Sequence, residues 1–401
     1  MNSIAVRSTV LVFCLACLVF SGLVSGRSGR QSSANADLIV HEWGTFTSIA
    51  DRSGKAVKWS PGGGPTDLPR FVEHFRTADF KGGLRGTVRM ETPVIYFYSP
   101  SETTVSVKVS FSRGVITEWY PRASHIEPDP GDVLSDTALF DGPRDGSIAW
   151  NSVMVSPELP AKLPQDGSEN HYYAARKTGA APVTVRTRKG VQQEKFLFYR
   201  GVSVFDVPVA AQSMVDGKVL VRNLGTEEIP EIILFERRGE KLGYRTGGAL
   251  QGEAELEPPE LTSTVESMSG DLEGVLIGRG LYPDEARAMI ETWKKSWFEE
   301  GSRLLYIVPP RVVNAVLPLS IHPAPAQVDR VFVGRLELIT SATEQEVETA
   351  LARHDYPTIA KFGRFLEPIL NDLYEKYPDQ AARLERELGE TYNAQASDPG
   401  K

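Results

Sequence analysis

Cysteine is almost absent from this sequence, which has 401 residues but only two cysteines, Cys14 and Cys17. Both lie within the first 36 residues, so the rest of the chain contains none. That part of the chain therefore cannot form disulfides, thiolate nucleophiles, iron–sulfur clusters or cysteine zinc sites. It is long enough to build a core that is stable without cross-links.

A surplus of positive charge is also missing. The chain has 44 Lys and Arg residues against 52 Asp and Glu residues, which gives a formal net charge of -8. Nucleic-acid binding depends on Lys and Arg side chains that neutralise phosphates, so a nucleic-acid partner is not expected. With 41% hydrophobic residues, the composition is that of a globular chain and excludes a disordered or collagen-like protein.

Long apolar runs are limited to residues 10–24, VLVFCLACLVFSGLV. A membrane-spanning helix needs about 20 apolar residues, so this shorter run indicates a signal peptide. Small residues suggest cleavage after Gly26 or after Ala36; an uncleaved anchor and a lipoprotein attached at Cys17 are the alternatives. We therefore predict a removed segment, 1–36, and a secreted or periplasmic protein that touches a membrane only if this segment stays uncleaved. Removal after Ala36 would change the net charge to -11.

The region 37–255 is predicted to be β-rich and sandwich-like. Short runs of Val, Ile, Thr and aromatic residues are separated by Gly, Pro, Asp and Asn clusters, which is typical of antiparallel sandwiches. A short helix is expected at 68–76. The expected strands are 38–49, 92–99, 104–112, 115–121, 171–176, 183–187, 194–200, 218–223 and 231–237.

The region 256–401 is predicted to be an α+β domain with C-terminal helices. A glutamate-rich stretch with a Pro-Pro pair, 252–266, indicates a linker before it. Pro283 suits the first turn of a helix over 283–300, whose apolar stripe indicates core packing. Strands are expected at 303–308 and 330–340, and helices at 341–353 and 358–390. The whole chain is thus predicted to have a β-rich, α+β fold.

Standard catalytic and cofactor motifs are missing. The segment HEWGT (41–45) begins like a zincin helix but has Thr at its fifth position and the composition of a strand. The sequence has no nucleophile elbow, P-loop or dinucleotide-binding fingerprint. Its six histidines lie far apart, so their spacing supports no metal site. We therefore predict no cofactor and no metal.

Five segments carry a resemblance to a known family. They are HEWGTFTS (41–48), RMETPVIYFYS (89–99), HYYAAR (171–176), FLFYRG (196–201) and GLYPDEARAMIETWKKSWFEEGSRLLYIVP (280–309). Together they resemble a family of large exported bacterial proteins that has no assigned activity. The resemblance covers most of the chain and implies export, but it implies no chemistry.

Charged residues on apolar strand faces are the unusual feature of the β-rich region. Residues two apart in a strand share a face, so Arg200 lies with Phe198, and Glu118 lies with Tyr120. An isolated buried ion costs several kcal/mol, so such charges must be paired or must line a cavity. One interpretation is a set of structural ion pairs, for example between Arg200 or Arg89 and Glu118 or Glu91.

The other interpretation makes Glu91 and Glu118 a catalytic carboxylate pair in a cleft. Glycoside hydrolysis uses one protonated and one ionised carboxyl group in such a pair. Arginines would suit a ligand that bears a carboxylate, and a tryptophan can stack on a sugar ring. The ligand-binding residues expected around the pair are His41, Glu42, Arg176, Arg200 and Trp119.

Two classes of function follow from these interpretations. The first is an extracytoplasmic binding or structural module, whose partner would be a glycan or another envelope protein. The alternative is a carboxylate-based or metal-assisted hydrolase, with glycans as a candidate substrate. Convergence of the candidate residues in one pocket would favour the hydrolase, and mutual pairing away from any cleft would favour the binding or structural module.

Overall fold

The computed structural model describes residues 35–59, 68–74, 84–129, 145–158 and 160–380, with a few single residues up to 389. All of these residues belong to one compact unit. Residues 1–34, which make up most of the predicted signal segment, lie outside the described residues. Within the described part, no helix combines the length and the apolar character that crossing a bilayer requires.

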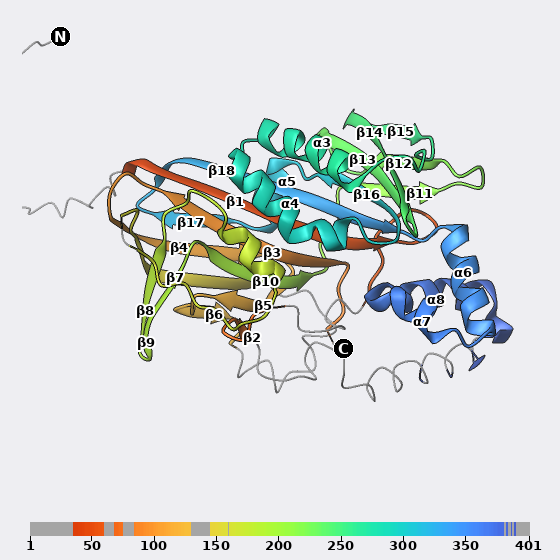
Figure 1. Ribbon diagram of the computed structural model, residues 1–401, viewed down its shortest axis with the longest axis horizontal. Coiled ribbons are helices and arrows are strands. Elements are labelled where there is room, and N and C mark those ends of the chain that lie inside the picture. Colours follow the sequence, from red (N-terminus) through yellow and green to blue (C-terminus); the bar gives the residue numbers. More distant parts are fainter. Residues whose placement is uncertain are drawn as a thin grey trace, which may run out of the picture. The chain divides into compact units, whose positions relative to one another are not determined.

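A nine-stranded sheet forms the centre of the fold (Figure 1). Its long central strand β1 (Asn35–Ala50) pairs in parallel with β18 (Pro325–Leu338) and in antiparallel with β3 (Val88–Tyr98). Both faces of β1 are buried, which explains its nearly continuous run of Val, Ile, Trp, Phe and Thr. In spatial order the strands are β14 (Lys241–Leu250), β13 (Ile229–Arg238), β16 (Gly301–Ile307), β18 (Pro325–Leu338), β1 (Asn35–Ala50), β3 (Val88–Tyr98), β10 (Leu197–Ser203), β5 (Gly114–Tyr120) and β2 (Glu73–His74).

Two smaller antiparallel sheets share a core with one face of the large sheet. Alternate residues such as Val107 and Ile148 from one small sheet and Val221 from the other join Phe97 of the large sheet in this core. The first small sheet contains β17 (Leu319–His322), β4 (Thr103–Phe111), β7 (Gly146–Val155), β8 (Val183–Thr187) and β9 (Gly190–Glu194), with β6 (His125–Glu127) paired to β7. The second contains β11 (Val209–Ser213), β12 (Val219–Asn223) and β15 (Glu253–Leu256). The predicted β-rich, sandwich-like α+β fold is thereby confirmed.

Helices cover the other face of the large sheet. These are the 3-10 helix η2 (His171–Arg176), α3 (Val265–Gly278) and α4 (Pro283–Trp297), of which α3 and α4 lie over β1, β16 and β18 in Figure 1. The start of α4 is fixed by Pro283 in its first turn and by Glu285, whose side chain accepts the backbone N–H of Tyr282 at 2.8 Å. The predicted apolar stripe of α4 is buried, which confirms its role in core packing.

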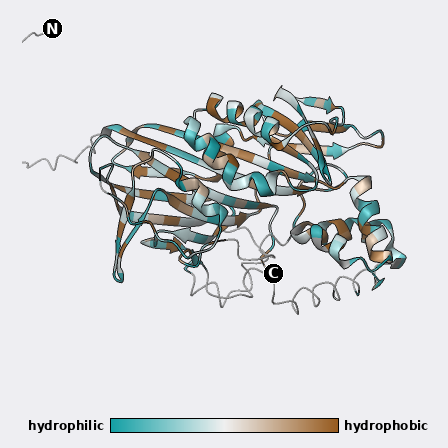
Figure 2. Ribbon diagram, viewed as in Figure 1, coloured by the Kyte–Doolittle hydropathy of each residue, from teal (hydrophilic) through white to brown (hydrophobic). Residues whose placement is uncertain are grey.

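The remaining helices follow β16 and β18. They are α5 (Pro310–Val316), α6 (Ser341–Ala352), α7 (Tyr356–Lys361), η3 (Gly363–Phe365), α8 (Leu366–Lys376) and η4 (Pro378–Gln380). Val347 of α6 and Leu370 of α8 form a third core with Ile49 and Trp59. Figure 2 shows hydrophobic residues along the strands, while the helices carry hydrophobic and hydrophilic residues together.

Three expected features differ in the structure. Residues 171–176 form η2 and not a strand, because Asn170 caps them by accepting the backbone N–H of Tyr172. Residues 68–74, the described part of the expected helix 68–76, form a turn followed by β2. The nine-stranded sheet also contains strands from both sides of the expected boundary near residue 255.

Candidate functional site

Glu91, Glu118 and Arg200 come from three adjacent strands of the large sheet. Arg200 on β10 is directly opposite Glu118 on β5, and Glu91 lies on β3, at the other side of β10. The pairing register shifts beside Arg200 on both sides, which marks β-bulges. The strand that carries Arg200 therefore lies between the strands of the two glutamates. Strands two apart in a sheet are separated by roughly 9.5 Å.

Each of the two predicted catalytic carboxylates has a donor on its own or an adjacent strand. Glu91 accepts a hydrogen bond from the Thr47 hydroxyl at 2.7 Å and lies 3.5 Å from the Nε atom of Arg89. Glu118 accepts a hydrogen bond from the Thr117 hydroxyl. Both glutamates are buried, at 2% and 3% exposed. Their surroundings are those of satisfied interior charges.

Arg200 is 1% exposed and binds a strained residue. Its Nε and Nη2 atoms donate to the Thr92 hydroxyl at 3.2 and 3.1 Å, and Nη2 lies 3.3 Å from His171 Nε2. Thr92 has a φ of 46°, a left-handed conformation that costs of order 1–3 kcal/mol for such a residue. The ring of His171 lies 5.6 Å from that of Trp293, so η2 and α4 close over this point of the sheet.

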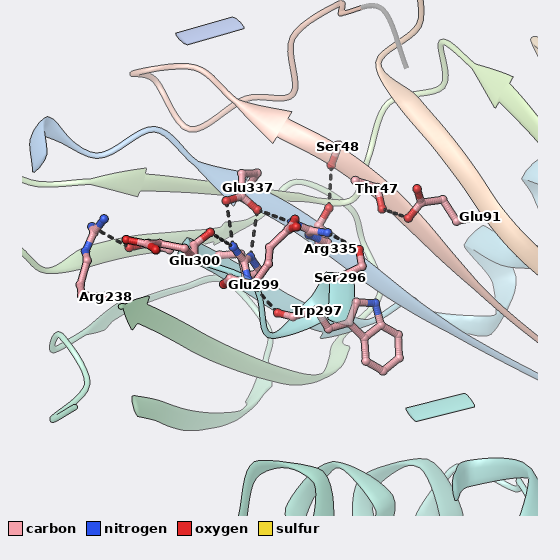
Figure 3. Close-up of polar contacts among 12 residues, drawn as sticks. Thr47, Ser48, Glu91, Arg238, Ser296, Trp297, Glu299, Glu300, Arg335 and Glu337 are labelled. Carbon is pink, nitrogen blue, oxygen red and sulfur yellow. Dashed lines mark hydrogen bonds and ion pairs between the residues drawn. The ribbon is translucent and has the colours of Figure 1, made fainter. Parts of the chain in front are cut away.

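A second group of buried charges spans β16 and β18 (Figure 3). Arg303 donates to both carboxylate oxygens of Glu337 at 2.9 and 3.2 Å, and Arg335 donates to one of them at 2.9 Å. Burial acts to raise the pKa of Glu337, but the two arginines outweigh it and hold the pKa below its ordinary value. Arg335 also binds Glu299 beyond the end of α4 at 2.6 Å. This group fixes α4 to the sheet.

Arg176 and Trp119 have neighbours other than the two glutamates. Arg176 on η2 binds Glu194 through two hydrogen bonds of 2.9 and 2.6 Å. Burial raises the pKa of Glu194, against the opposing effect of Arg176. Trp119 is 6% exposed and packs in the sandwich core, on the face of β5 opposite to Glu118. Neither residue joins a common site with the glutamates.

His41 and Glu42 lie near the other end of β1, where their partners on β18 are in register. His41 is paired with Asp329, and Glu42 is paired with Arg330. Successive strand residues point to opposite faces, so His41 makes its contact on one face of the sheet and Glu42 makes its contact on the other. The predicted ligand-binding residues His41 and Glu42 therefore contact Asp329 and Arg330, which the sequence did not reveal as site residues.

His41 is held between two carboxylates. Its Nδ1 atom is 2.7 Å from Glu285 Oε2, and because a carboxylate only accepts hydrogen bonds, Nδ1 carries the proton in that bond. Its Nε2 atom is 3.4 Å from Asp329 Oδ2 and makes no hydrogen bond within the described residues. The Tyr98 hydroxyl donates to the other oxygen of Glu285 at 2.8 Å. Burial, followed by the charge of Glu285, keeps the pKa of Tyr98 well above its usual range, so this hydroxyl stays protonated.

Glu42 positions Arg330 on the opposite face. The Glu42 carboxylate accepts hydrogen bonds from Arg330 Nε and from the Tyr199 hydroxyl, both at 2.5 Å. Arg330 Nη1 donates to Asn314 at 2.8 Å and to the carbonyl oxygen of Leu317 at 2.7 Å. Its Nη2 atom is buried and has no hydrogen-bond partner among the described residues, which costs about 1–3 kcal/mol if nothing else binds it.

Asp329 and Arg330 line a cavity of about 750 Å³. This volume lies within the usual range of small-molecule sites. Its other lining residues are Arg279, Pro310, Asn314, Pro318, Leu319, Ser320, Ile321, Ala324, Pro325 and Val328. A smaller cavity of about 560 Å³ is lined by Tyr98 and Lys195, but that ammonium group is already bound by two backbone carbonyl oxygens. The larger cavity is therefore the candidate site.

Sequence reasoning missed the residues that form this site. Glu285 lies in the first turn of the predicted helix 283–300, where an acidic residue is favourable, yet it is fully buried and also binds His41. Asp329 and Arg330 carry no local motif, and their role depends on the pairing of β18 with a strand almost 290 residues earlier. The signal that could have found them is the adjacent pair of charges, Asp-Arg, at the start of the expected apolar strand 330–340.

Comparisons with known proteins give no family. No protein-family model matches the sequence, and no curated protein is similar to it. The solved structures that match include the yeast delta-COP-I mu-homology domain complexed with a Dsl1 WxWxV peptide, with 7% identity, 76% of this chain, 98% of that chain and a TM-score of 0.28. The same yeast domain without the peptide has a TM-score of 0.26 at the same identity and coverage. Similarity this low carries no inference about function. Among the described residues, no group of three or more His, Asp or Glu side chains is arranged to hold a metal ion.

Proposed function

We propose that this chain is an exported binding module that takes a small ligand in the cavity lined by Asp329 and Arg330. The observation that carries the proposal is the support behind those two side chains. On the neighbouring strand β1, His41 contacts Asp329, and Glu42 accepts a hydrogen bond from Arg330. Binding residues that are fixed by buried neighbours lose little freedom when a ligand binds, which favours affinity.

The environment of the two glutamates favours binding over hydrolysis. Glycosidases place their two carboxyl groups about 5–9.5 Å apart with a sugar between them. Here the strand that carries Arg200 lies between Glu91 and Glu118, and neither glutamate lines the 750 Å³ cavity. The apolar segment at residues 10–24 supports export of the module.

A cavity-filling substitution tests the proposal. The purified protein would be screened by thermal shift against sugars, organic acids, amino acids and short peptides. A ligand at 100 times its Kd stabilises a protein by about 2.7 kcal/mol, so at least one class should raise the Tm by a few degrees. Ala324→Trp places an indole in the cavity and should abolish that shift.

Ala326→Trp is the matched control, because Ala326 lies two residues further along the chain, is exposed on β18 and does not line the cavity. It should keep the full shift. A screen in which no class stabilises the protein, or a shift that survives Ala324→Trp, would contradict a binding function at this cavity.

A further inference from the structure

Strand β18 has an open edge beside the cavity. On one side it pairs with β1 from Pro325 to Leu338, but on the other side its pairing with β16 begins only at Val333. The backbone N–H of Val308 still binds the carbonyl oxygen of Phe332 at 2.9 Å. In the described part of the chain, no strand pairs with residues 325–331 on that side. An open edge presents backbone donors and acceptors to an incoming extended chain.

The cavity lies along this open edge. Val328 and Arg330 of β18 line it from one side, and Pro310 and Asn314 of α5 line it from the side where β16 ends. Val328 is 42% exposed and gives this wall of the cavity an apolar surface. The site thus combines an unpaired strand edge, which can bind the backbone of a peptide, with apolar walls, which can bind its side chains.

Charged groups with free bonding capacity lie at the same wall. Arg279 is exposed and donates through Nη2 to the carbonyl oxygen of Pro230 at 2.8 Å, and no ion pair joins it to Asp329. Gln327 and His41 both contact Asp329 at Oδ2, while Oδ1 accepts no hydrogen bond within the described residues. Gly280, with a φ of 112°, lets the chain pass so close to Asp329 that a Cβ atom would lie 3.3 Å from its carboxyl carbon.

We propose that this cavity binds a short peptide with an apolar residue and a free C-terminus, which adds to the open edge of β18. The peptide carboxylate binds Arg279, and a peptide N–H group donates to Asp329 Oδ1. Guanidinium and carboxylate groups form strong charge-assisted hydrogen bonds, whereas main-chain pairing along the edge is independent of sequence. This inference rests on the proposed binding function and names its ligand class.

Calorimetry with the tripeptide Ala-Leu-Ala tests the inference on the full chain. The peptide should bind, and methylation of its central backbone nitrogen should weaken binding at least tenfold, because a methylated nitrogen cannot pair with a strand edge. Replacing the C-terminal carboxylate by an amide should weaken binding about tenfold in the unmodified protein. In Arg279→Ala the acid and the amide should bind equally.

Arg287→Ala is the matched control, because Arg287 is an exposed arginine on α4 that pairs with Glu273 outside the cavity. It should keep the preference for the acid. Absence of binding at millimolar peptide overturns the inference, and so does binding that ignores both methylation and Arg279→Ala. If the tripeptide fails while another ligand class gives a shift that Ala324→Trp abolishes, the peptide inference falls and the binding function stands.

Discussion

At the scale of single residues, His41 and Glu42 show how one short segment supports two sides of a sheet. Their roles depend on alternation along β1, which the sequence does predict, and on their partners, which it does not. Glu285 is the clearest case. It lies within the predicted helix 283–300, but its full burial depends on α4 packing over the end of β1. Local patterns therefore predicted the element and missed the contact.

Loss of the Glu285 carboxylate should destabilise the protein strongly. Glu285 accepts hydrogen bonds from His41, the Tyr98 hydroxyl and the Tyr282 backbone N–H, so Glu285→Ala leaves three donors unpaired. A buried polar group that loses its partner costs about 1–3 kcal/mol, which urea unfolding would measure as a lower midpoint. Glu285→Gln should cost less, because its amide oxygen still accepts.

Glu291→Ala is the control for that measurement. Glu291 is on the same helix, but its side chain is 42% exposed and pairs with the exposed Lys294. A surface change of this kind should alter stability by no more than about 0.5 kcal/mol. Equal effects of Glu285→Ala and Glu291→Ala would show that the buried contacts do not stabilise the end of the sheet.

At the scale of elements, the structure separates what local patterns can predict from what they cannot. The helix that begins at Pro283 and the helix that begins at Ser341 were both predicted, because their first turns carry strong start signals. Helix α3 was missed, because the glutamates and the Pro-Pro pair before it indicate an extended linker, although Thr264 caps it. Pairing between distant strands such as β1 and β18 has no local signal.

The C-terminal helices should be held to the sheet in a pH-dependent way. Arg52, just after β1, binds Glu344 of α6 and Asp372 of α8, both at 2.8 Å. Burial, followed by a hydrogen bond with Glu344, raises the pKa of Asp372 to about 6. Burial acts to raise the pKa of Glu344 as well, but Asp372, Lys376 and Arg52 outweigh it and lower that pKa. The two acids thus share one proton at mildly acidic pH.

A raised pKa in the folded state means that the stability from protonated Asp372 is present below its unfolded pKa and is lost as pH rises through about 6. The lowered pKa of Glu344 works in the other direction and reduces stability only at more acidic pH. Amide hydrogen exchange in α6 and α8, corrected for intrinsic rates, should therefore show more opening at pH 7.5 than at pH 5. Asp372→Asn should remove this difference.

Asp379→Asn provides the comparison, because Asp379 is an exposed acid shortly after α8. It should keep the pH dependence of the unmodified chain. Opening that is the same at both pH values before any substitution would show that the shared proton does not affect how α6 and α8 are held.

At the scale of the whole molecule, composition and strand patterns predicted the fold class, but the order of strands joins the two expected regions. Strands β16 and β18 come from the second region, and they lie between β13 and β1 of the first. Such an arrangement could not be inferred from the glutamate-rich stretch at 252–266, which is a surface feature of one compact unit. The composition of a segment indicates how exposed to solvent it is. It does not indicate whether the strands before and after it belong to the same sheet.

The two regions should consequently fail to fold apart. A chain that covers 37–255 lacks β16 and β18, so one edge of the long central strand β1 would be unpaired and apolar. Exposed edges of this kind promote aggregation. We expect such a chain to be insoluble or to lack the cooperative unfolding transition that circular dichroism detects for the full protein. A chain that ends at residue 340 keeps all nine strands and should unfold cooperatively. A soluble, monomeric 37–255 chain with a sharp transition would instead establish two independent folding units, and the cavity beside β18 would then belong to the second of them.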